Sequence, residues 1–272
     1  VNAEVLFFYI MLFASVFLYL FIRIIKKDSI KVSKKLLLKL VGIGSLMAFH
    51  WLFFFSSIKV SNVSIALSCL GTSTLFAALL EPLIFKRKID LSEIVMGIVI
   101  VICISLIFKV EFQYKLGIIY GLICALLGTI FSVFNGKLYG KTSSGNIIFY
   151  EIFGGFLVIS LYYVFSGQIS QIGEISYRDL ALLTLLASVF TAYPMFESVN
   201  LMKYISPFTL ILTVNLEPIY GIILAFFIFG ESEKMSAVFY GASLVMILAI
   251  VINGVIKARK KSKEIAIENT QE

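Results

Sequence analysis

A carboxylate and a proline stand side by side within a long apolar run, in the stretch TVNLEPIYG, residues 213–221. An ionised carboxylate at the centre of a bilayer is rare unless it faces a cavity or a protein partner. Proline has no amide hydrogen, so Pro218 would leave the carbonyl of Val214 without its helical donor. We therefore expect Glu217 to bind a proton or a cationic group. The alternative is that a protonated or hydrogen-bonded Glu217 only stabilises the interruption at Pro218.

Two polar stripes follow helical spacing along apolar runs. They are Thr209, Thr213, Glu217 and Tyr220 in one run, and Ser64, Ser68 and Thr72 in another. Lipid offers these side chains no hydrogen bonds, so each stripe needs a wet cavity or a protein partner. The groups that we expect to bind a ligand by hydrogen bonds at the membrane centre are Asn215, Tyr220, Thr72 and Ser73.

Five further residues are candidates for the wall of a cavity. A lone histidine can bind protons near neutral pH, although such a residue is more often structural. Aromatic side chains can stack on a ligand or bind a cation. The carboxylate of Glu197 lies near the end of its apolar run, which favours a structural interpretation. The amide of Asn135 ends a stripe of small residues typical of close helix packing. The five residues are His50, Trp51, Tyr193, Glu197 and Asn135.

Two more carboxylates lie in apolar runs. Glu81 is five residues before Lys86, and we interpret the two as an ion pair at the membrane interface. Glu151 lies one to two turns inside its run, and the sequence favours neither a structural nor a functional role for it.

The composition is that of a membrane protein. Of 272 residues, 60% are hydrophobic and 14% are charged, whereas a soluble domain carries about a quarter charged residues. Nine apolar runs reach the length of about 20 residues that spans a bilayer as a helix. They are 5–25, 37–57, 62–85, 91–109, 115–135, 145–166, 179–199, 206–229 and 235–256. We predict an all-α integral membrane protein with these nine transmembrane helices.

The basic residues predict the orientation. Alternate connections hold 18 and 5 of the 23 Lys and Arg residues, and the richer side should be cytoplasmic. This places the C-terminus in the cytoplasm and the chain in the cell (cytoplasmic or inner) membrane. Because topology explains the net charge of +7, we expect a lipid bilayer and no nucleic acid as partner.

An internal repeat organises the spans. A shift of 144 residues places the four spans from 5 to 109 on those from 145 to 256 and pairs Tyr19 with Tyr163 and Gly97 with Gly241. The span 115–135 has no counterpart, so we expect a further helix before Val1. The predicted organisation is a first repeat at 1–109, a second at 115–256 and a basic cytoplasmic tail at 257–272. Five helices per repeat give two halves of opposite orientation, which is typical of transporters.

These residues resemble the drug/metabolite transporter superfamily in its EamA-type ten-helix form. The resemblance covers nearly the whole chain. It rests on HWLFFFSSIKVSNVSIAL, LLEPLIFKRKIDLSEIVMG and ISPFTLILTVNLEPIYGIILAFFIFGESEKMSAVFYGASLV. Glu231 matches the acidic residue that commonly ends the ninth helix, whereas Arg87 stands at the corresponding place in the first repeat. The resemblance implies transport of small metabolites, often export, through a central cavity between the repeats.

We therefore predict a secondary transporter of a small organic metabolite, an amino acid or related compound, that exports it by alternating access with protons as a candidate coupling ion. A single histidine excludes a metal site that needs two imidazoles, and no cofactor is expected. An enzyme is not expected because the spans hold no deep Asp, no HExxH motif and no second His. A passive channel or a structural membrane protein remains the alternative. The sequence does not predict the oligomeric state.

Overall fold

The computed structural model describes residues 3–88, 91–169, 172, 175–214 and 217–271, and these residues contain no β-strand. Eight helical runs among them are long and apolar enough to cross a membrane, and they coincide with eight of the nine predicted spans. The runs are Glu4–Ile25, Lys34–Val60, Val63–Phe85, Leu91–Val110, Phe112–Leu138, Ser144–Ser166, Tyr177–Leu201 and Ala237–Ile256. The predicted class, an all-α integral membrane protein, is confirmed.

The ninth predicted span, 206–229, includes residues 215 and 216, which lie outside the described residues. Two helices flank them: α10 (Pro207–Val214) and α11 (Glu217–Phe229). The last predicted span, 235–256, belongs to a longer helix, α12 (Ala237–Gln271), which continues through the basic tail.

The contacts divide the chain into two compact units, and each unit combines two separate segments. Unit 1 comprises Val1–Phe55 and Ile130–Pro207, and unit 2 comprises Ser56–Thr129 and Phe208–Glu272. Two long helices, α2 (Lys34–Val60) and α6 (Lys115–Leu138), contribute to both units.

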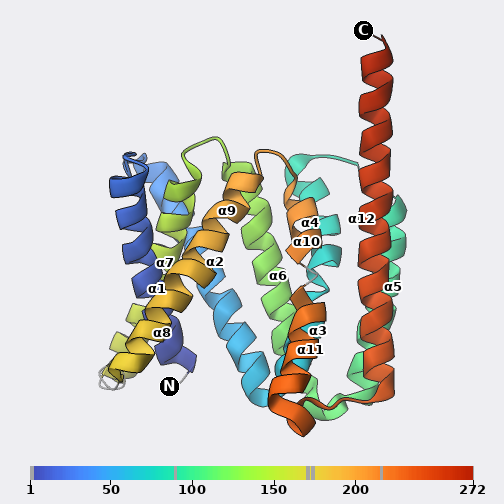
Figure 1. Cartoon of the computed structure of the whole chain (residues 1–272), viewed down its shortest axis with the longest axis horizontal. Coiled ribbons are helices and arrows are strands. Elements are labelled where there is room, and N and C mark those ends of the chain that lie inside the picture. Colours follow the sequence, from blue (N-terminus) through green and yellow to red (C-terminus); the bar gives the residue numbers. More distant parts are fainter. Residues whose placement is uncertain (1–2, 89–90, 170–171, 173–174, 215–216, 272) are drawn as a thin grey trace. The chain divides into compact units, whose positions relative to one another are not determined.

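Unit 1 is a bundle whose centre is α1 (Ala3–Leu20), packed along α7 and α8 (Figure 1). One face of α1 is fully buried because its apolar residues recur every three or four positions, at Phe7, Ile10, Met11 and Ala14. The other elements of unit 1 are η1 (Phe21–Ile25), α7 (Ser144–Ser166), α8 (Tyr177–Ala187), η4 (Ser188–Ala192) and α9 (Tyr193–Leu201).

Two elements of unit 1 are π-helical turns, η1 and η4. The second lies directly before α9, which carries Pro194 in its first turn. Because proline lacks an N–H and its ring crowds the carbonyl four residues earlier, a widened turn is a common response. The π-helical turn η4, directly before Pro194, fits this response.

The helices of unit 2 pack in pairs. In Figure 1, α3 lies beside α11 and α12 lies beside α5, and the members of each pair are in contact. The elements are α3 (Val63–Leu70), α4 (Ser73–Phe85), α5 (Leu91–Val110), η2 (Phe112–Tyr114), α10, α11, η5 (Gly230–Glu233) and α12.

Two outer helix ends in unit 2 follow the shift of 144 residues. The start of α3 at Val63 falls on the start of α10 at Pro207, and the end of α4 at Phe85 falls on the end of α11 at Phe229.

Candidate functional site

The span Val63–Phe85 is divided into α3 and α4 beside the predicted site residues Thr72 and Ser73. Helix α3 ends at Leu70 and α4 begins at Ser73. Between them, Gly71 N donates to Ser68 O (3.2 Å) and Thr72 N donates to Cys69 O (3.0 Å), each to a carbonyl three residues earlier. The Thr72 side chain is buried and its hydroxyl donates to Cys69 O at 2.6 Å. Ser73 is half-buried, and its carbonyl accepts a hydrogen bond from Thr129 at 3.3 Å.

The stripe on α3 obtains its hydrogen bonds from the protein. The Ser64 hydroxyl donates to Glu233 at 2.7 Å, and the Ser68 hydroxyl shares a hydrogen bond with Ser243 at 3.2 Å. Sequence spacing predicted that these hydroxyls need either a cavity or a protein partner. The structure gives them protein partners more than 160 residues away in the sequence.

Two buried glutamates hold the N-terminal ends of α3 and α10. Glu233 accepts from the amides of Val63 at 3.0 Å and Ser64 at 2.9 Å, while Glu81 accepts from the amide of Phe208 at 2.9 Å. The first turn of a helix has amides without intrahelical partners and a partial positive charge, so a carboxylate there is stabilising. Each of these helices thus begins against a carboxylate from the other predicted repeat.

Glu81 also belongs to an ion-pair cluster. Arg87 makes two hydrogen bonds to Glu93, at 2.9 and 3.2 Å, and its Nε lies 3.7 Å from Glu81. The predicted partner of Glu81 was Lys86, and this interpretation was wrong. Lys86 ends α4 in a left-handed conformation (φ 55°), and the chain direction changes there, so that Arg87 lies near both carboxylates.

The predicted polar stripe that contains Glu217 is exposed along both α10 and α11. Thr209, Thr213, Glu217 and Tyr220 are all exposed, and the Thr213 hydroxyl donates to Thr209 O at 3.0 Å. Pro218 lies in α11, and Asn215 lies outside the described residues.

In unit 1, Asn135 contacts a carboxylate that sequence reasoning did not select. Both Asn135 and Glu151 are fully buried, and the Asn135 amide Nδ2 donates to Glu151 Oε2 at 3.1 Å. The two residues lie on different helices, α6 and α7, so helical spacing gave no signal for the pair. A buried carboxylate preceding two glycines, Gly154 and Gly155, was the only available indication.

The other predicted wall residues of unit 1 are separate from this pair. The ring of Trp51 stacks on Phe7 with centroids 6.3 Å apart and lies 5.7 Å from Phe55, which places it in the aromatic core. His50 is half-buried beside it.

The two candidates on α9 are less buried. Tyr193 is exposed, and Glu197 accepts a hydrogen bond from Asn200 at 3.2 Å. The two residues are three positions apart, which places both side chains on one face of α9.

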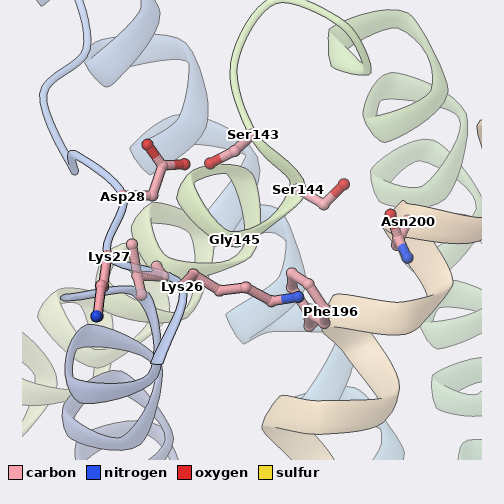
Figure 2. Close-up of a pocket in the computed structure, with 9 residues that line it drawn as sticks. Lys26, Lys27, Asp28, Ser143, Ser144, Gly145, Phe196 and Asn200 are labelled. Carbon is pink, nitrogen blue, oxygen red and sulfur yellow. The ribbon is translucent and has the colours of Figure 1, made fainter. Parts of the chain in front are cut away.

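A polar pocket of about 330 Å³ lies elsewhere in unit 1, where η1, α7 and α9 meet (Figure 2). Its lining residues are Ile22, Lys26, Lys27, Asp28, Ser143, Ser144, Gly145, Phe196 and Asn200. The Lys26 ammonium lies 5.6 Å from the ring centres of both Phe21 and Phe196. Figure 2 shows the Asp28 carboxylate on the other side, near Ser143, so the pocket offers both charges.

The wall of this pocket is held in place by α7. The Asn146 amide donates to Ser29 O at 2.9 Å, and the Tyr150 hydroxyl donates to Ile30 O at 2.7 Å. Lys27 has a left-handed backbone (φ 51°), a conformation that costs energy in residues other than glycine. Sequence reasoning counted these lysines only as topology signals and missed the pocket.

Within the described part of the chain, no group of three or more His, Cys, Asp or Glu side chains is placed to hold a metal ion. The three cysteines, Cys69, Cys103 and Cys124, are buried thiols without disulfides.

A known family model matches part of this chain. Residues 1–109 match the model of the EamA-like transporter family. Over these residues the match confirms the sequence resemblance, and the matched family implies a membrane transporter of the drug/metabolite class.

Solved structures agree with this family at the level of the fold. Nineteen chains match, and one of them, described only as the crystal structure of a protein, covers 95% of this chain and 90% of its own length. Its TM-score is 0.68 at 12% sequence identity, so the likeness shows the fold alone. No curated protein matches the sequence.

Proposed function

We propose that this protein is a secondary transporter that exports a small organic metabolite, an amino acid or related compound, by alternating access. Two inverted repeats, 1–109 and 115–256, would form its two halves in the cytoplasmic membrane, with the C-terminus in the cytoplasm. The observation that carries the proposal is the interruption of a membrane span between α3 and α4, in a chain whose first 109 residues match the model of a transporter family.

Interrupted helices support transport for a physical reason. Helix ends expose amides and carbonyls that a continuous helix would satisfy, and in a membrane such groups are tolerated where they line a cavity or meet protein. The outer ends of α3 and α10 are occupied by Glu233 and Glu81. We assign the interruption between α3 and α4, at Thr72, to contact with a ligand.

The candidate residues take the following roles in this proposal. Glu217 recognises a charged group or carries a proton, and Tyr220 and Asn215 bind the ligand by hydrogen bonds. Thr72 and Ser73 lie where the span of α3 and α4 is interrupted. For Thr72 the backbone is the contributing group, since its hydroxyl is already bonded to Cys69 O. Pro218 keeps the carbonyl of Val214 without its helical donor.

The pocket in unit 1 supports a charged substrate. It places the Lys26 ammonium and the Asp28 carboxylate on one polar surface, and its volume of about 330 Å³ falls in the range of small-ligand sites. A molecule with both an ammonium and a carboxylate group complements these two charges. We assign the pocket the role of a first contact for such a molecule on the cytoplasmic side.

The test is flux in proteoliposomes that contain the full chain and a labelled mixture of α-amino acids. We expect uptake or release that saturates with concentration, responds to a pH gradient, and decreases at least tenfold in Glu217→Gln. Flux that rises in proportion to concentration and is unaffected by Glu217→Gln would instead indicate a passive channel. The matched control is Glu231→Gln, which removes an exposed carboxylate near the end of the same span.

A further inference from the structure

The contact between Glu151 and Asn135 leaves two buried oxygens without a hydrogen-bond partner. Asn135 Nδ2 donates to Glu151 Oε2 at 3.1 Å, while Glu151 Oε1 and Asn135 Oδ1 have no partner. Glu151 has no exposed surface and Asn135 has 1%. Buried polar atoms in native proteins are nearly always satisfied, so an orphaned pair on two contacting side chains requires an explanation.

The groups that approach α7 near Glu151 include backbone and apolar side chains of α1 and α2. A Cβ on Gly44 of α2 would overlap the backbone of Glu151, so no side chain separates α2 from α7 there. One turn further along α7, the neighbours are Val41 and Met47 of α2 and Met11 of α1. None of these groups titrates, and Glu151 has no salt bridge among the described residues.

An ionised Glu151 would therefore be a buried charge with a single amide donor to compensate it, which is strongly unfavourable. A proton on Glu151 Oε1 removes the buried charge and provides a hydrogen bond for both oxygens that have no partner. The resulting O–H is a donor, and the amide oxygen Asn135 Oδ1 is an acceptor beside it on the same partner. A carboxylic acid and an amide then form two hydrogen bonds in opposite directions, and both orphaned oxygens are satisfied.

We propose that Glu151 and Asn135 form a proton-binding site, and that this site loads and releases the proton that drives transport. The inference rests on the proposed transport function and gives it a coupling site. It places the coupling proton in unit 1, on a residue other than Glu217.

A metal ion fits the site less well than a proton does. Hard cations such as Ca²⁺ and Mg²⁺ take about six to eight oxygen ligands. The pair offers two unoccupied oxygens, and the Asn135 N–H already occupies the third. The donor set therefore fits a proton.

The test is infrared difference spectroscopy of the purified full chain between mildly alkaline and mildly acidic buffer. We expect a carboxylic-acid C=O stretching band that appears on acidification and is absent from Glu151→Gln. The band should persist in Glu217→Gln, the matched control. Asn135→Leu should keep the band and shift it to higher frequency, because the acid loses the amide that hydrogen-bonds to its carbonyl.

Three outcomes would overturn the inference: a band that does not change with pH, a band that persists in Glu151→Gln, or a band that disappears in Glu217→Gln. Because the measurement needs no substrate, its failure is distinct from failure of the proposed function. Saturable flux without a titrating Glu151 band would refute only the proton site. A titrating Glu151 band in a protein without saturable flux would refute only the transport proposal.

Discussion

The buried carboxylates of unit 2 and of unit 1 are compensated in different ways. In unit 2, Glu93 is paired with Arg87 at 2.9 Å, and Glu233 accepts three hydrogen bonds from Val63 and Ser64. In unit 1, Glu151 receives one hydrogen bond from a neutral amide. Glu93 and Glu233 receive enough hydrogen bonds to compensate the negative charge of an ionised carboxylate. Glu151 receives one hydrogen bond, which suits a neutral carboxylic acid.

This difference separates the structural carboxylates of unit 2 from Glu151, for which we propose proton exchange. A carboxylate fixed by an arginine or by helix amides loses energy if it is protonated, because its donors would face an O–H group. A carboxyl paired with an amide gains a hydrogen bond on protonation. The contrast predicts that substitutions in unit 2 affect mainly stability and that substitution of Glu151 affects mainly coupling.

The largest effect should come from removing the cation of unit 2. Arg87→Met leaves Glu93 buried without its partner, and we expect a loss of about 3 kcal/mol, the low end for breaking a buried pair because Arg87 is partly exposed. Unfolding of the purified protein in detergent measures this loss. Lys88→Met, a neighbouring exposed cation, is the control, and equal unfolding of both variants would show that the cluster contributes no stability.

A backbone contact in unit 1 gives the next effect. Gly44→Ala would place a methyl group in the backbone of Glu151, and overpacking against rigid backbone costs about 2–3 kcal/mol. The same change at Gly42, where a Cβ meets nothing within 4 Å, should stabilise α2 by about 0.5–1 kcal/mol through helix propensity. If the two variants show the same stability, α2 and α7 are not in the close contact that encloses Glu151.

Glu233→Gln should cost about 2 kcal/mol, because an amide group replaces one of two oxygens that accept hydrogen bonds at the start of α3. The control lies two residues away. Glu231 is exposed and paired only with Lys234, so Glu231→Gln should change stability by less than about 0.5 kcal/mol. A loss in Glu231→Gln as large as in Glu233→Gln would contradict the assignment of the helix cap to Glu233.

The smallest effect on stability should come from Glu151→Gln. Glutamine can accept from Asn135 Nδ2 and donate to Asn135 Oδ1, so it reproduces the protonated acid. We expect a change below about 0.5 kcal/mol, which the same unfolding measurement detects. Strong destabilisation would mean that Glu151 is ionised and has donors beyond the Asn135 amide.

The sequence predicted the spans because their apolar runs have membrane length, and it selected Thr72 and Ser73, which lie where α3 ends and α4 begins. It could not predict contacts between distant helices. Ser64 was recognised as needing a partner, but nothing in its spacing indicates Glu233. Asn135 was selected as a candidate, whereas its partner Glu151 was not, because the two are related only by the packing of α6 and α7.

Local backbone conformation limited the prediction in a second way. Counting residues favoured Lys86 as the partner of Glu81, but a left-handed residue at that position turns the chain toward Arg87. The left-handed conformation is unusual for lysine, and composition does not indicate it.

The most direct test of the account is transport of labelled α-amino acids in proteoliposomes, driven by a pH gradient and compared between the wild type and Glu151→Gln. The account predicts that the variant folds, still exchanges substrate across the membrane without a gradient, and loses the accumulation that the gradient drives. Accumulation at the wild-type level in Glu151→Gln would contradict the assignment of the coupling proton to Glu151.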